Sequence, residues 1–177
     1  TQSLPETLKA GLTTPCNEML SNGTRKDLKN MANLPYYEQK DIENIKKLRD
    51  MMKELPPFCT EFFRGIEPRT STRTRIAYAY DLSVFFDFLR KENPVLSKLE
   101  RMDITLDYLD RITVTDLEEY MEYLKYRFND HNQEITNKER GIMRKISSLK
   151  SFYNYFFRTE KLTTNPAALV QLPKLHE

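Results

Sequence analysis

The chain has 177 residues, which is enough for one domain, or for one domain with an extension, around a buried core. The 28 Lys and Arg nearly balance the 26 Asp and Glu, so the net charge of +2 by itself indicates no particular partner. Cys16 and Cys59 are too few and too far apart for a disulfide framework or a zinc site, and no apolar run approaches the roughly 20 residues of a membrane span.

The composition favours an all-α fold. Ten Phe and ten Tyr recur mostly at helical spacing, there are only four Gly, and no long stretch alternates between apolar and polar residues. The N-terminus lacks the basic and then apolar pattern of a signal peptide. We therefore expect a soluble cytoplasmic protein with no membrane contact, and no residue cluster suggests a metal or a cofactor.

The first part of the chain divides into an arm and a helical extension. Residues 1–35 combine scattered Thr, Asn, Pro and Gly with little periodicity, so we expect a flexible arm. A helix is predicted over 37–55, because apolar side chains share one face and two prolines follow. A short aromatic helix is predicted over 58–65. We treat 36–67 as a helical extension ahead of the main domain.

A second strong helix is predicted over 69–92, with Ser71 or Thr72 as its N-cap. Its buried stripe consists of Tyr78, Leu82, Phe85, Phe86 and Leu89. Arginines 69, 73 and 75 alternate with threonines at the start of this helix. A helix N-terminus surrounded by cations and hydroxyls suits an anion such as phosphate. The alternative is that these arginines only make the helix start soluble.

Two further helices are predicted before a loop over 129–135. A short one over 103–109 precedes a longer one over 112–128, which has a capping box at Thr115 and Glu118. The stripe of the longer helix consists of Leu117, Tyr120, Met121, Leu124 and Phe128. Lys125 and Arg127 lie toward its end, where cations complement the helix dipole, so they need not contact a polyanion.

The last predicted helix, over 136–158, is basic and amphipathic, with a capping box at Thr136 and Glu139. Its stripe consists of Ile142, Ile146, Leu149, Tyr153, Phe156 and Phe157. The opposite face carries Arg140, Arg144, Ser147, Ser148, Ser151 and Tyr155, and no carboxylate. Serine has modest helix propensity, but its small hydroxyl suits a helix that lies against phosphates.

Charge is distributed unevenly along the chain. Residues 136–161 contain seven Lys or Arg and two Glu, whereas residues 100–122 contain eight acidic residues and two Arg. A domain with one basic and one acidic side fits a protein that binds a polyanion in one orientation. An ordinary solvated charged helix is the alternative that charge leaves open.

Four segments, in this order, resemble the core-binding domain of tyrosine recombinases: TRTRIAYAYDLSVFFDFL, ITVTDLEEYMEYL, RKISSLKSFYNYFFR and NPAALVQLPKL. The resemblance covers about 68–175 and implies a SAM-like bundle of four to five helices, which we place at 68–172. Residues 173–177 would then start the linker to a catalytic domain. The stretch 34–65 is similar to an extension found in some integrases of bacterial mobile elements.

The resemblance implies a bacterial or phage-encoded protein that clamps duplex DNA during integration or excision of a mobile element or phage. Its partners would be double-stranded DNA and other protomers on the DNA, with a monomer expected without DNA. Tyrosine recombinases cleave DNA with a tyrosine assisted by arginines, a lysine and histidines. His131 and His176 show no His-x-x-Arg pattern, so no catalytic residue is assigned and we expect no cleavage by this chain, a fragment of a longer recombinase.

The predicted DNA-binding residues are Arg73, Arg75, Arg140, Arg144, Lys145 and Ser148. Most of them should contact phosphates, because they lie among hydroxyls or at a helix start. Arg144 is long and central on the outer face, so it is the best candidate for a guanine edge. Lys145 lies at the flank of the buried stripe.

Three other functions stay open. A helical protein interaction module could dock an acidic partner on the basic helix. A helix-turn-helix regulator fits less well, because the loop over 129–135 is longer than the usual turn of three or four residues. A self-contained enzyme fits least, because the sequence has no Gly-rich phosphate loop and no nucleophile–base spacing.

Overall fold

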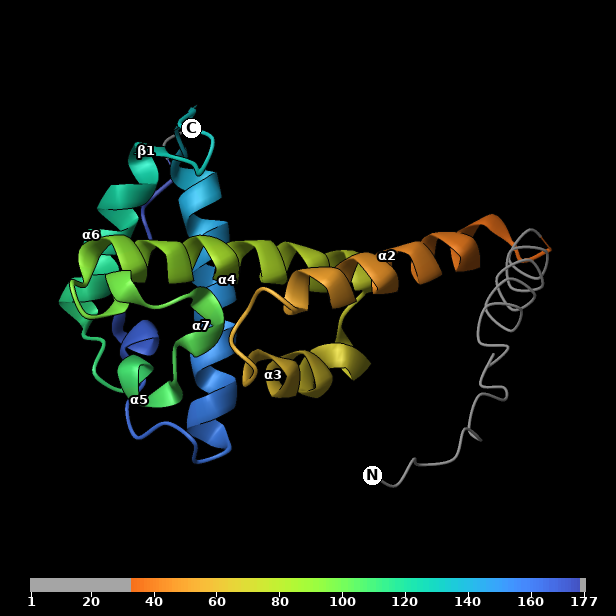
Figure 1. The fold of residues 1–177 in the computed structure, drawn as a ribbon, viewed down its shortest axis with the longest axis horizontal. Coiled ribbons are helices and arrows are strands. Elements are labelled where there is room, and N and C mark those ends of the chain that lie inside the picture. Colours follow the sequence, from red (N-terminus) through yellow and green to blue (C-terminus); the bar gives the residue numbers. More distant parts are fainter. Residues whose placement is uncertain (1–32, 176–177) are drawn as a thin grey trace, which may run out of the picture. The chain divides into compact units, whose positions relative to one another are not determined.

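The structure, a computed structural model, describes residues 33–175. The described residues fall into two units that divide between residues 41 and 42, and their buried hydrophobic residues all belong to the second. The predicted all-α class is confirmed (Figure 1). The helices are α2 (Tyr36–Met52), α3 (Cys59–Ile66), α4 (Thr72–Glu92), α5 (Leu106–Leu109), α6 (Val114–Lys125) and α7 (Glu139–Arg158). Short 3₁₀ turns are η1 (Glu67–Arg69), η2 (Leu96–Lys98), η3 (Arg101–Asp103) and η4 (Pro166–Leu169).

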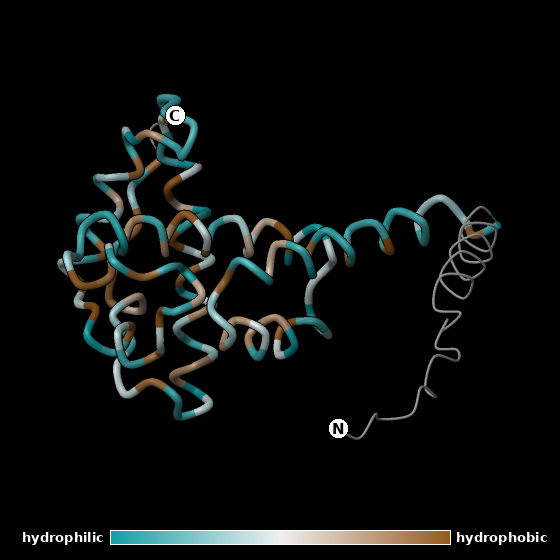
Figure 2. The backbone as a smooth tube through the Cα atoms, in the orientation of Figure 1, coloured by the Kyte–Doolittle hydropathy of each residue, from teal (hydrophilic) through white to brown (hydrophobic). Residues whose placement is uncertain are grey.

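The helices predicted over 37–55 and 58–65 correspond to α2 and α3, with ends that differ by one to three residues. Most of α2 is hydrophilic, and its buried residue is Leu48 (Figure 2). The arm predicted for 1–35 falls largely outside the described residues, as do Cys16 and His176. No helix within residues 33–175 is long and apolar enough to cross a membrane.

The helix predicted over 112–128 is shorter in the structure. It ends at Lys125, and the chain then forms a hairpin in which β1 (Arg127–Phe128) pairs antiparallel with β2 (Glu134–Ile135). Asn132 in the turn has a φ of 56°, in the left-handed region that asparagine tolerates. Because it lies on a strand rather than on the helix face, Phe128 is 42% exposed instead of buried.

Capping sets the starts of α4 and α6. The Ser71 hydroxyl caps α4 by accepting a hydrogen bond of 3.1 Å from a backbone N–H three residues later, which confirms one of the two predicted caps. The capping box of α6 forms between Thr113 and Asp116, two residues before the predicted pair Thr115 and Glu118. The box therefore starts the helix where the structure has it, at Val114.

The predicted capping box at Thr136 and Glu139 does not form, because α7 begins only at Glu139 and has no side-chain cap. The reason lies in Asn137. Its backbone N–H donates to the Leu124 carbonyl at 3.1 Å, and its side-chain oxygen accepts a hydrogen bond of 2.5 Å from buried Arg127. These bonds hold the segment before α7 against the end of α6, so it stays extended.

Aromatic side chains from α3, α4 and α7 form the centre of the core. Phe152 on α7 is fully buried, and its ring lies edge-on at 5.4 Å from Phe62 and at 5.0 Å from Phe156, between centroids. Leu149 is buried as predicted, but Phe157 is 47% exposed, because the next position along α7 turns away from the core. The predicted stripe is therefore right in its direction and too wide by one residue.

Candidate nucleic-acid interface

The two longest helices of the bundle, α4 and α7, cross one another, and a buried carboxylate lies at the crossing (Figure 1). Asp81 on α4 is 1% exposed. It accepts hydrogen bonds from three residues on one turn of α7: 3.0 Å from Arg144 Nη2, 2.8 Å from Lys145 Nζ and 2.7 Å from Ser148 Oγ. Because a buried charge is costly unless it is paired and hydrogen-bonded, these donors fix α7 against α4.

Burial removes three of the predicted DNA-binding residues, Arg75, Lys145 and Ser148, from the outer surface. Lys145 and Ser148 are each 1% exposed, because α4 covers the flank of α7 that the helical pattern assigns to solvent. Burial also lowers the pKa of Lys145, although its pairing with Asp81 opposes this. Arg75 is buried as well, and its guanidinium donates to the backbone carbonyls of Glu67 and Thr70 at 3.1 and 2.9 Å. All three support the helices rather than line an outer surface.

Arg73, Arg140 and Arg144 are exposed, as predicted for residues of a binding face. Arg144 keeps 57% of its side chain exposed while it pairs with Asp81. At about 100° per residue, positions 140, 144, 151 and 158 fall within about 40° of one another around α7. A ridge of three arginines and one serine therefore runs along this helix, and its only acidic residue, Glu139, lies off the ridge.

Two arginines that belong to this face are absent from the predicted set. Arg158 continues the ridge at the C-terminal end of α7, and Arg69 in η1 lines the same pocket as Arg158. Both are exposed. The spacing of 14 residues between Arg144 and Arg158 is the sequence signal that could have identified the second of them. For Arg69 the sequence signal is its place beside Arg73 and Arg75 at a helix start, but only the fold brings η1 beside α7.

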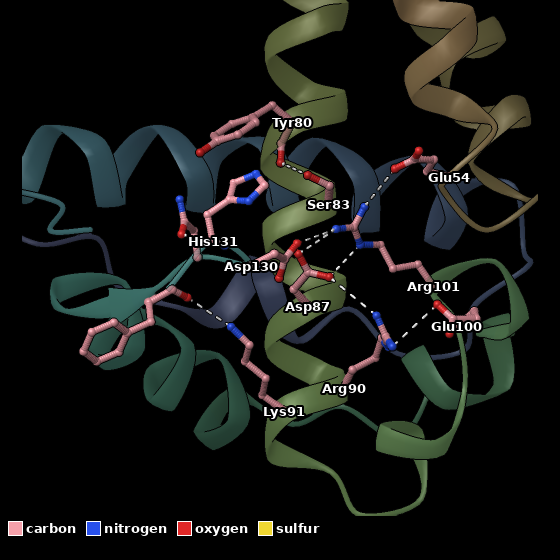
Figure 3. Close-up of polar contacts among 12 residues, drawn as sticks. Glu54, Tyr80, Ser83, Asp87, Arg90, Lys91, Glu100, Arg101, Asp130 and His131 are labelled. Atoms are coloured by element: carbon pink, nitrogen blue, oxygen red, sulfur yellow. Dashed lines mark hydrogen bonds and ion pairs between the residues drawn. The ribbon is translucent and has the colours of Figure 1, made fainter. Parts of the chain in front are cut away.

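The arginines of this face differ from those near the C-terminal end of α4 in whether they form ion pairs. Within residues 33–175, the side chains of Arg69, Arg73, Arg140 and Arg158 make no ion pair or hydrogen bond. Near the C-terminal end of α4, by contrast, Arg101 binds Asp87 through Nε at 2.5 Å and Nη2 at 2.9 Å (Figure 3). Cations that lack a carboxylate partner are the ones available to an external anion.

The paired cluster in Figure 3 joins four segments of the chain. Arg101 also approaches Glu54 at 3.7 Å and Asp130 at 3.6 Å, and Arg90 lies 3.6 Å from Glu100. The cluster thus holds α4, η3, the turn after α2 and the hairpin together. Its arginines are neutralised by acidic neighbours, so this end of α4 is a structural junction rather than a site for a polyanion.

Comparison with known proteins gives consistent matches. Residues 54–172 match the family described as the phage integrase SAM-like domain. The tyrosine recombinase XerC of Caldanaerobacter subterraneus subsp. tengcongensis is 33% identical over 130 residues, which is 68% of this chain and 35% of that protein. XerC of Chlorobaculum parvum is 32% identical over 123 residues, 68% of this chain and 31% of that protein.

The tyrosine recombinase XerS of Lactococcus lactis subsp. cremoris is 30% identical over 117 residues, which cover 64% of this chain and 32% of that protein. The chain therefore spans about a third of the length of the curated relatives it matches. No solved structure shows significant similarity to it.

Proposed function

The chain belongs to the phage integrase SAM-like domain family, the core-binding region of tyrosine recombinases, and we propose that it grips duplex DNA with one arginine-rich face. That face consists of Arg69, Arg73, Arg140, Arg144 and Arg158. The observation that carries the proposal is the pairing pattern. Four of these arginines have no acidic partner within the described residues, whereas the arginines at the far end of α4 are paired.

Most contacts of this face would be to phosphates. Arginine forms strong, bidentate hydrogen bonds to phosphate oxygens, and such contacts position a protein on DNA without reading its sequence. Arg144 differs because Asp81 already holds one of its nitrogens, which leaves the other donors of its guanidinium for an external acceptor. We propose that it is the residue that reaches a guanine edge.

The wider activity is also a proposal. The relatives are named tyrosine recombinases and are about twice as long as this chain, and the family region matched here is the core-binding one. We infer that cleavage and rejoining belong to a catalytic domain outside these residues, and that neighbouring protomers assemble on the DNA. Incubating the chain with a nicked suicide duplex should give no covalent adduct on a denaturing gel.

Fluorescence anisotropy with a labelled duplex of mixed sequence tests the DNA-binding proposal. The affinity should be roughly micromolar or weaker and should fall steeply with salt, because bound counterions are released. The double variant Arg140→Gln, Arg144→Gln should flatten the slope of log affinity against log salt by up to about two units. Arg111→Gln is the matched control, since Arg111 is exposed in the acidic segment and stacks on Tyr108.

Circular dichroism should show an intact fold for each variant. If the double variant keeps the affinity and slope of the unaltered chain, DNA binding by this face is wrong. Binding of an acidic protein, measured with the same variants, would then favour the alternative function, a helical interaction module.

A further inference from the structure

A pocket of about 290 Å³ lies where η1 and the start of α4 meet the C-terminal half of α7. Arg69 of η1 and Arg158 of α7 both line it, and Asn154 and Ser151, which lie about one and two turns before Arg158 on α7, line it as well. No Asp or Glu of the described residues lines this pocket. The site therefore offers two guanidinium groups, a hydroxyl and an amide, which are all groups that donate to phosphate oxygens.

The electrostatics of the pocket favour an anion. Two cations brought to one concave site without a carboxylate repel each other. An anion that binds between them attracts both and so offsets this repulsion. Neither Arg69 nor Arg158 has an ion pair or hydrogen bond within residues 33–175, and the same holds for the side chains of Ser151 and Asn154. A pocket of this size, several times the roughly 30 Å³ that a water molecule occupies, accommodates a phosphodiester group.

We propose that this pocket binds a single backbone phosphate of duplex DNA and so fixes where α7 lies along the strand. The inference rests on the proposed function, because the arginine ridge of α7 leads from the pocket toward Arg144 and Arg140. A ligand that enters the pocket and also follows the ridge must carry phosphates at regular intervals. An internal phosphodiester of DNA fits this better than a free phosphate ion.

A substitution beside the pocket can test it without removing a charge, because Tyr155 forms part of its wall. The ring of Tyr155 packs directly on Gly65 of α3, so that a Cβ at this glycine would collide with the ring, lying 2.8 Å from Cζ. Phe62 and Phe156 pack against the same ring from the core side and are fully buried. Because these two rings block the core side, we expect alanine at Gly65 to push the Tyr155 ring toward the pocket that it lines.

The test compares variants in salt-dependent anisotropy with a blunt mixed-sequence duplex. Arg158→Gln and Gly65→Ala should each weaken binding about tenfold at low salt, and each should lower the salt slope by about one unit. Arg158→Lys should keep most of the slope, because the charge stays. The double variant Gly65→Ala, Tyr155→Ala should regain affinity to within about twofold, because the displaced ring is gone. Arg111→Gln serves as the control.

The outcomes separate this inference from the proposed function. If Arg140→Gln, Arg144→Gln weakens binding while Arg158→Gln and Gly65→Ala leave it unchanged, the face binds DNA and the phosphate pocket is wrong. If Gly65→Ala impairs folding, the salt slopes measured for Arg158→Gln and Arg158→Lys still show whether the pocket binds a phosphate.

Repeating the titration with duplexes that carry or lack terminal 5′-phosphates distinguishes the sources of phosphate. An effect of Arg158→Gln only on phosphorylated ends would assign the pocket to phosphate monoesters and overturn the proposal.

Discussion

Asp81 shows how one buried carboxylate can organise a binding face. It holds Lys145 and Ser148 inside the helix crossing, and it holds the partly exposed Arg144 at the surface. The Lys145 ammonium also lies 4.7 Å from the centroid of the Tyr80 ring. An arginine that is bonded on one side loses less side-chain entropy when its free side binds DNA. The structural and binding roles of this cluster are therefore linked.

Removing the Asp81 charge should destabilise the fold strongly. Asp81→Asn leaves Lys145 buried without its counter-ion, and breaking a buried pair in this way costs about 3–5 kcal/mol. The double variant Asp81→Asn, Lys145→Met should recover much of the loss, because no unpaired charge then stays buried at the crossing of α4 and α7. Urea denaturation followed by circular dichroism measures both, and equal stability of Asp81→Asn and the unaltered chain would contradict the buried pairing.

At the scale of single elements, α7 depends on its aromatic stripe. Phe156 is fully buried against Phe58, Phe152 and Tyr155. Phe156→Ala should therefore cost about 3–5 kcal/mol in the free energy of unfolding, because it leaves a cavity between α3 and α7. Phe157→Ala is the matched control on the neighbouring, exposed position and should cost about 0.5 kcal/mol or less. Similar losses for the two variants, in urea melts, would show that the side of α7 facing the core is misassigned.

Asp110 attaches the segment after α7 to the turn before α6. It accepts hydrogen bonds from the backbone N–H groups of Thr163 and Thr164 at 2.9 and 3.0 Å, and also from their hydroxyls. Desolvation opposes ionisation, but these bonds outweigh it and lower the pKa of Asp110 below its ordinary 3.8. Since the unfolded chain takes up the proton first, this stabilisation is complete above pH 3.8 and is lost as the pH falls through the lowered pKa.

Asp110→Asn should therefore be less stable than the unaltered chain at pH 7, by about 1 kcal/mol or less because the site is partly exposed. The difference between the two proteins should shrink when urea melts are repeated below the pKa of Asp110. Asp107→Asn is the control, since Asp107 is exposed on α5. A stability difference that stays constant or grows on acidification would refute this role of the carboxylate.

Across the whole molecule, periodic apolar positions were enough to predict the main helices, and the order of four segments carried the family resemblance, but neither identified the interface. The helical pattern of 136–158 predicts that Lys145 and Ser148 face solvent, because the sequence of one helix does not show which part of it another helix covers. Arg69 was recognised only as one of the cations at a helix start, since its place in one pocket with Arg158 depends on the fold. The start of α7 differs from the prediction because a tertiary bond from Asn137 to the end of α6 outweighs a local capping box. Contacts between residues that are far apart in the sequence therefore determine which side chains are buried and where α7 begins.

The uneven charge of the molecule leads to a last prediction. Exposed Glu118, Glu119 and Glu122 on α6 lie in the acidic segment, and α6 packs against α7. Their field should oppose the approach of DNA in wrong orientations. Changing all three to Gln should raise affinity for a mixed-sequence duplex by about two- to fivefold at low salt, and this gain should vanish near 0.5 M salt, where the Debye length falls to about 4 Å. A gain that persists at high salt would mean that these side chains meet the duplex directly, and reduced affinity would mean that the acidic side takes part in binding.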